Sequence, residues 1–149
     1  MLKRTHFVIG IFVVILFFPH VNNKLIFVPT VLVASLLPNI DHFFTFINKK
    51  ATIRTSQSFV KLRGVFHSLT LCILISIALA LYFPVFAFPF FLGYSLHLLA
   101  DSWTTDGIKP FWPFQELVRG RVIEGSSLEE GIFFVFVILD FVFLFLLFV

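Results

Sequence analysis

This 149-residue chain has few charged residues and a single cysteine. Only 13% of its residues are Asp, Glu, Lys or Arg, against roughly 25% in a typical soluble domain. Since 59% of the residues are hydrophobic, polar side chains cannot cover the surface, and a lipid bilayer is the solvent that removes this problem. The one cysteine, Cys72, lies in an apolar run and carries no information about redox compartment. The composition therefore predicts an integral membrane protein with a single small domain.

Several signatures of soluble enzymes and binding proteins are also missing. The chain has no Gly-rich phosphate loop and no Cys-x-x-Cys pair, and no stacking platform supports nucleic-acid binding. The stretch "GYSLH" at Gly93–His97 begins like the Gly-x-Ser-x-Gly elbow of serine hydrolases. It ends in His, however, and lies inside a predicted helix rather than at a strand–helix turn, which argues against a nucleophilic serine.

Five apolar segments are present, and a spanning helix needs about 20 mostly apolar residues. The segments lie at about Thr5–Pro19, Lys24–Leu37, Val65–Phe83, Val85–Ala100 and Gly131–Val149. We therefore expect an all-α integral membrane bundle of about five transmembrane or membrane-embedded helices, forming one domain over residues 1–149. The first two segments are short, so they either span with snorkelling flanks or form a re-entrant hairpin.

The basic residues predict the orientation through the positive-inside rule. If the amino terminus is cytoplasmic and all five segments span, ten of the eleven Lys and Arg residues lie inside and only Lys24 lies outside. The result is the same if the first two segments only dip into the membrane and return. We expect a multi-pass protein of the inner, cytoplasmic membrane, with its N-terminus on the cytoplasmic face and an interfacial loop over residues 102–131.

Histidine and aspartate side chains gather at the cytoplasmic ends of the predicted helices. They are His6, Asp41, His42, His67, His97 and Asp101. His97 and Asp101 stand at i and i+4, which places them on one side of a helix. With Asp41 and His67 they would supply two imidazoles and two carboxylates, a mixture that suits zinc or another divalent transition metal better than calcium. His6 would serve a second metal or support these ligands.

The alternative interpretation is an ordinary membrane–water border, where such side chains are common. Successive spans cross the membrane in opposite directions, so the number of spans alone brings several helix ends to this face. The co-location of these side chains is therefore partly a consequence of the topology. The depth of His97 is not forced, since it lies about one helical turn inside an apolar run, where an unpaired polar group is costly. This depth favours a shared site for the metal ligands.

The same residues carry a resemblance to the YdjM-like family of membrane-bound, predicted metal-dependent hydrolases. The matching blocks are "TH" at Thr5–His6, "PNIDH" at Pro38–His42, "RGVFHS" at Arg63–Ser68, "GYSLHLLAD" at Gly93–Asp101, "TTDG" at Thr104–Gly107 and "WPF" at Trp112–Phe114. One position departs from the family pattern, because Asn39 stands where relatives have an acid. If that acid bridges two metals in relatives, a two-metal mechanism is in doubt here.

The family is itself similar to the zinc-dependent phospholipase C and single-strand nuclease group. Carried over, this likeness implies one zinc site formed by Asp41, His67, His97 and Asp101, with His6 near a second. It also implies hydrolysis of a phosphoester by metal-activated water, with a phospholipid as one candidate substrate.

The remaining roles follow from the chemistry of such a site. Asp41 or Asp101 would act as general base. The groups expected to support the ligands are Asn39, His42 and Ser68. Arg63 would either hold an anionic group of the substrate or simply anchor the basic loop at the membrane face.

Two other classes of function stay open. A metal or solute transporter should carry polar residues at mid-membrane on several spans, but only Asp140 qualifies. A non-catalytic membrane protein with a degenerate metal site is the other alternative, and Asn39 favours it. The sequence predicts neither the substrate nor the oligomeric state.

Overall fold

The computed structural model describes residues 1–39, 65–114 and 116–149. Within these stretches the chain forms five α-helices, which are α1 (Lys3–Phe17), α2 (Lys24–Leu36), α5 (Leu69–Tyr82), α6 (Pro84–Ser102) and α7 (Ser127–Phe148). Two 3-10 helices, η1 (Phe18–His20) and η2 (Leu37–Asn39), follow α1 and α2. The described residues contain no strand, only two isolated β-bridges in the loop between α6 and α7. The prediction of an all-α membrane bundle is confirmed.

The helix boundaries follow from local signals in the sequence. Pro84 occupies the first turn of α6, where its missing N–H costs nothing, and it separates α6 from α5. Ser68 caps α5 by accepting a hydrogen bond from the Leu71 backbone N–H. Ser126 caps α7 in the same way, and Glu129 and Glu130 stand in its first turn, where carboxylates complement the helix dipole.

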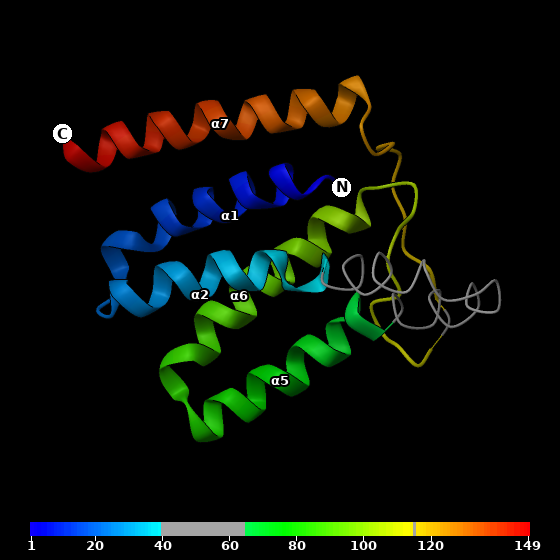
Figure 1. The fold of residues 1–149 in the computed structure, drawn as a ribbon, viewed down its shortest axis with the longest axis horizontal. Helices are drawn as coiled ribbons and strands as arrows, with labels where there is room; N and C mark the ends of the chain where they lie inside the picture. Colours follow the sequence, from blue (N-terminus) through cyan, green and yellow to red (C-terminus); the bar gives the residue numbers. More distant parts are fainter. Residues whose placement is uncertain (40–64, 115) are drawn as a thin grey trace, which may run out of the picture.

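The helices pack in the spatial order α7, α1, α2, α6, α5 (Figure 1). α1 lies between α7 and α2, while α6 packs against α2 on one side and α5 on the other. The N-terminus, the end of α6 and the beginning of α7 lie toward the same end of the bundle (Figure 1). This end is the one to which the sequence assigned the histidines and aspartates.

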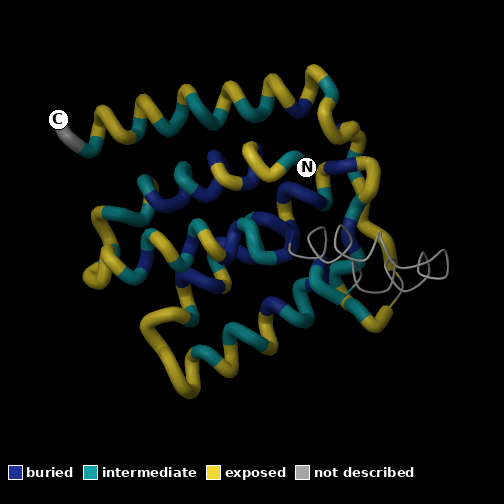
Figure 2. The backbone as a smooth tube through the Cα atoms, viewed as in Figure 1, coloured by how far each residue is buried: buried dark blue, intermediate teal, exposed yellow. Residues whose placement is uncertain are grey.

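Three stretches are long and apolar enough to cross a membrane, namely Lys3–His20, Pro84–Ser102 and Ser127–Leu147. α2 and α5 are apolar but shorter. α7 contacts mainly α1, and apart from Glu129 in its first turn none of its described residues is buried (Figure 2). Large apolar side chains such as Phe141 and Phe145 are therefore exposed along α7, as expected of a surface that lipid covers.

Gly93 sets the distance between α2 and α6. A Cβ atom at this position would lie only 2.4 Å from the carbonyl oxygen of Val31 and 3.0 Å from Cβ of Ala34. The absence of a side chain therefore lets the two helix backbones approach closely. The next residue, Tyr94, is almost fully buried in the main apolar cluster. This close approach brings the end of α2 against the part of α6 that carries His97.

Candidate metal centre

The last two turns of α6 supply the first two residues of the site. His97 and Asp101 are 1% and 4% exposed, and the i, i+4 spacing places His97 Nε2 3.1 Å from Asp101 Oδ2. The sequence predicted that these two side chains share one side of the helix, and the structure has this arrangement. A buried carboxylate in an apolar bundle is costly unless other groups compensate its charge.

His6 comes from the first turns of α1 and is 1% exposed. Its ring stacks on that of His97, with 3.8 Å between ring centroids and 14° between planes. Its Nε2 lies 3.1 Å from Asp101 Oδ1, the carboxylate oxygen that faces away from His97 Nε2. His6 therefore belongs to the same cluster as the α6 pair, rather than to a separate location.

His67 also belongs to the cluster and lies in the segment that precedes α5. Its Nε2 lies 3.3 Å from Asp101 Oδ2, and its ring centroid is 5.5 Å from that of His97. The hydroxyl of Tyr94 donates a hydrogen bond to the carbonyl of Phe66, so α6 holds the backbone directly next to His67. Three imidazoles from three segments thus surround the single carboxylate of Asp101.

The tautomer of His97 follows from its contact with α2. Nδ1 lies 2.7 Å from the carbonyl oxygen of Ser35, which can only accept a hydrogen bond. In a neutral His97 the proton is therefore on Nδ1, and Nε2 carries a lone pair. Support of a ligating imidazole by a backbone carbonyl is a common arrangement in metal sites.

Because Nε2 of His97 carries a lone pair, the cluster fits a divalent metal. The lone pair of His97 Nε2 and the anionic Oδ2 of Asp101 are two acceptors only 3.1 Å apart, and a cation between or beside them would relieve their repulsion. Among the described residues, His97 Nε2 and both ring nitrogens of His6 are buried without a hydrogen-bond partner. One ligand atom from each of His6, His97 and Asp101 lies within 4.8 Å of the others. Imidazole nitrogen and carboxylate oxygen suit zinc and similar transition metals.

The α-amino group of Met1 also reaches Asp101. It donates a hydrogen bond of 2.8 Å to Oδ1, and both groups are buried. A cation next to this carboxylate lowers the cost of burying its charge. The amino group of Met1 therefore contacts the cluster from the side of α1.

Glu129 connects α7 to this end of α1. Its side chain is 1% exposed, and Oε1 accepts hydrogen bonds from the Leu2 backbone N–H at 2.6 Å and the Thr5 hydroxyl at 3.0 Å. Oε2 accepts from the Gly125 N–H at 2.7 Å. Glu129 thereby fixes the beginning of α1 immediately before His6.

The other predicted site residues divide into two groups. Asp41, His42 and Arg63 lie outside the residues that the structure describes. Asn39 is 8% exposed, and its Nδ2 has no hydrogen-bond partner within the described part of the chain. Ser68 was expected to support a ligand, but its hydroxyl caps α5 and donates to the Val65 carbonyl at 2.7 Å.

Sequence reasoning missed two contributors, Glu129 and the carbonyl of Ser35. The pattern Ser126–Glu129 has the spacing of a capping box, which signals a helix start, so the acidic residue could have been assigned to α7. Its bonds to α1 leave no trace in a single sequence. The Ser35 carbonyl is a backbone group, and its role depends on the approach that Gly93 permits.

Comparison with known proteins gives one match. The family model described as YdjM inner membrane protein matches residues 1–149, the whole of the chain. Neither the comparison with curated proteins nor the comparison with solved structures gives a match.

Proposed function

The chain belongs to the family of YdjM inner membrane proteins, and on that premise we propose that it is a membrane-bound metal-dependent hydrolase that acts on a phosphoester. The observation that supports this proposal is the convergence on Asp101. The Nε2 atoms of His6, His67 and His97 lie within 3.1–3.3 Å of its two carboxylate oxygens. Such a set of nitrogen and oxygen donors favours zinc, or a similar divalent transition metal, as the cofactor.

His6, His67, His97 and Asp101 would hold the metal. When bound, a divalent transition metal supplies Lewis acidity toward water and toward a phosphoryl oxygen. The hydrogen bond from His97 Nδ1 to the Ser35 carbonyl keeps the other ring nitrogen available as a ligand. Asp101 supplies negative charge to balance the cation.

Three further residues of the proposed site lie outside the described part of the chain. Asp41 would be a further ligand or the general base, and Asp101 is the second candidate for the base. His42 would orient a ligand, and Arg63 would hold the anionic group of the substrate.

Metal content and hydrolysis of detergent-purified protein test this function. We expect about one transition-metal ion per chain, as sites of this ligand count hold, and metal-dependent hydrolysis of an activated phosphodiester such as bis(p-nitrophenyl) phosphate. Both should be lost in His97→Ala. A wild-type protein without transition metal, or a His97→Ala variant that keeps it, would contradict the proposal. Metal binding without any hydrolysis would favour the degenerate-site alternative.

We further propose that the metal centre faces the cytoplasm. Lys3 and Lys24 lie at opposite ends of the first helical hairpin, and the distribution of basic residues places Lys3 inside. In intact cells, a membrane-impermeant maleimide should label Lys24→Cys but not Lys3→Cys, and Cys72 should stay unlabelled because it is fully buried. The reverse labelling pattern would overturn this orientation.

A further inference from the structure

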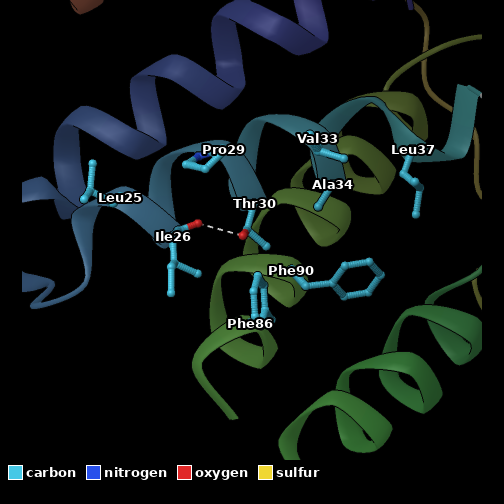
Figure 3. Close-up of a pocket in the computed structure, with 9 residues that line it drawn as sticks. All are labelled: Leu25, Ile26, Pro29, Thr30, Val33, Ala34, Leu37, Phe86 and Phe90. Carbon is cyan, nitrogen blue, oxygen red and sulfur yellow. Dashed lines mark hydrogen bonds between the residues drawn. The ribbon is translucent and has the colours of Figure 1, made fainter. Parts of the chain in front are cut away.

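An apolar groove runs along α2 where it faces α6, with a volume of about 400 Å³. Leu25 and Ile26 lie at one end, Leu37 lies at the other, and Phe86 and Phe90 of α6 form the opposite side (Figure 3). Among the described residues of the lining, Thr30 alone carries a hydroxyl, and it donates to the Ile26 carbonyl at 2.6 Å. Since this hydroxyl is already satisfied, the groove offers only hydrocarbon surface to an occupant.

The length of the groove matches one leaflet of a bilayer. Leu25 and Leu37 are twelve residues apart, which corresponds to about 18 Å at a rise of 1.5 Å per residue. The hydrocarbon core of a bilayer is about 30 Å thick, so one leaflet contributes about 15 Å. In a membrane helix bundle, the chains of lipids are the molecules of this length and polarity that surround such a groove.

The groove leads to the metal centre. Ala34 lines it, and the next residue, Ser35, accepts the hydrogen bond from His97 Nδ1. Leu37, at the end of the groove, belongs to the same 3-10 helix η2 as Asn39. A chain in the groove would therefore have its head group at the end of the bundle that holds the cluster.

A second pocket, of about 620 Å³, lies at this end, and its lining includes Met1 and the polar side chains of Asn39 and Lys3. The pocket borders the cluster because the amino group of Met1 donates to Asp101. Asn39 is 8% exposed, and its Nδ2 is a buried donor with no acceptor among the described residues. Lys3 and Arg4 are the basic side chains of the described lining and Glu124 is its acid; because Arg4 pairs with Glu130 at 3.3 Å, Lys3 is the cation that we assign to an anion.

Resting on the proposed function, we propose that the substrate is an anionic phospholipid that uses both features. Its hydrocarbon chain lies in the α2–α6 groove, and its phosphate lies against Asn39 and Lys3 beside the metal ligands. The groove would then select a lipid over a water-soluble phosphoester. An amide at position 39, in place of an acid, would favour the anionic head group.

Photo-crosslinking in nanodiscs tests the groove without requiring turnover. The probes are phosphatidic acid and phosphatidylcholine, each with a diazirine in one acyl chain. We expect adducts with phosphatidic acid on the groove residues to exceed those on equally exposed residues of α7. Val33→Trp should lower the groove adducts about tenfold, the factor for losing roughly two methylene contacts. Val33 lines the groove and is 60% exposed, so the substitution spares the core. Val135→Trp on α7, at a position that is 55% exposed, is the matched control and should change nothing.

The same crosslinking tests the head-group site. Asn39→Asp should abolish the preference for phosphatidic acid over phosphatidylcholine, because a carboxylate repels the phosphate. Asn23→Asp is the control, since Asn23 is exposed at the other end of α2 and its side chain caps nothing. A preference that survives Asn39→Asp would overturn the assignment of Asn39.

The outcomes separate this inference from the proposed function. Uniform adducts along α2, α6 and α7 would reduce the groove to ordinary lipid contact and overturn the inference, even if metal and hydrolysis are intact. Selective adducts in a protein without metal or hydrolysis would instead overturn the enzymatic function and leave a lipid-binding site. If Val33→Trp converts a dimer to a monomer while the adducts stay uniform, the occupant of the groove is a second copy of the chain.

Discussion

The imidazole of His6 lies flat against that of His97, with ring centroids 3.8 Å apart. The two rings come from α1 and α6, and their Nε2 atoms approach opposite oxygens of the same carboxylate, each at 3.1 Å. Asp101 is therefore the group that all the imidazoles share. Each of the two rings has its own support. His97 donates a hydrogen bond to the Ser35 carbonyl, and Glu129 binds Thr5, the residue that precedes His6.

Asp101→Asn should remove most of the bound metal while preserving the size of the side chain. Loss of a group that merely supports a ligand typically costs about 10–100-fold in metal affinity, and loss of the shared carboxylate should cost more. Metal titration followed by elemental analysis measures the effect. Asp140→Asn in α7 is the control acid within a membrane helix and should keep the metal. Equal losses in both variants would show that any charge change disrupts the protein.

Glu129→Gln should weaken metal binding although the residue is not a ligand. The amide directs an N–H₂ group toward backbone or hydroxyl donors that the carboxylate now satisfies, so the beginning of α1 loses its anchor. We expect a loss of about 2–4 kcal/mol in stability, together with a lower metal affinity. Thermal unfolding with and without metal measures both.

The neighbouring substitution Glu130→Gln is the matched control for Glu129. Glu130 is 55% exposed, and within the described residues its ion pair is with Arg4, which is 51% exposed, so its loss should cost less than about 1 kcal/mol. A Glu130→Gln variant that behaves like Glu129→Gln would contradict the anchoring role of Glu129.

Gly93→Ala should separate α2 from α6. The new methyl group would lie 2.4 Å from the Val31 carbonyl oxygen, and backbone cannot move away cheaply. Overpacking of this kind costs about 1–3 kcal/mol, and the displaced Ser35 carbonyl should lower metal affinity as well. Gly131→Ala in α7 meets no described atom within 4 Å, so it should keep the metal affinity and should keep or slightly raise the stability, because alanine favours a helix more than glycine does. Equal stability of the two variants in thermal unfolding would refute the close approach.

Tyr94→Phe should destabilise the segment that carries His67. The variant loses one hydrogen bond, to the Phe66 carbonyl, which is worth about 1 kcal/mol. Tyr82→Phe is the matched control, because Tyr82 is 77% exposed at the end of α5. Hydrogen exchange at residues 65–68 measures the effect, and protection that is unchanged in Tyr94→Phe would argue against this anchor.

Chelation of the metal should lower the unfolding temperature of the wild-type protein. A ligand that binds only the folded state stabilises it by about 2.7 kcal/mol at a hundred times its dissociation constant. The same chelator should have a much smaller effect on Asp101→Asn, which retains little metal. A wild-type unfolding temperature that does not respond to chelator or to added zinc would count against a metal at this site.

The sequence predicted the helices well because hydrophobicity alone determines where a chain can enter lipid. The predicted segment Val85–Ala100 corresponds to α6 at Pro84–Ser102. The last helix was expected from Gly131, but it begins at Ser127. The two acids at 129 and 130 were assigned to the loop on polarity, whereas Ser126 caps the helix and the acids complement its dipole. The third helix was expected from Val65, but α5 begins after its cap at Ser68.

The cluster was predictable only in outline. Helix parity brings His6, His67, His97 and Asp101 to one end, and the i, i+4 spacing pairs the last two. The number of spans does not determine how each helix is rotated about its own axis, so it could not show that His6 stacks on His97. The spacing also could not show that the Ser68 hydroxyl caps α5.

The contact between Thr5 and Glu129 has a consequence for the biogenesis of the protein. These residues are 124 positions apart, so the beginning of α7 must be synthesised before α1 can receive its anchor. The first helix to enter the membrane must wait for the last one before the ring of His6 is held in place. A chain interrupted between the end of α6 at Ser102 and the beginning of α7 at Ser127 would carry every histidine of the cluster and still lack the contact that fixes the beginning of α1.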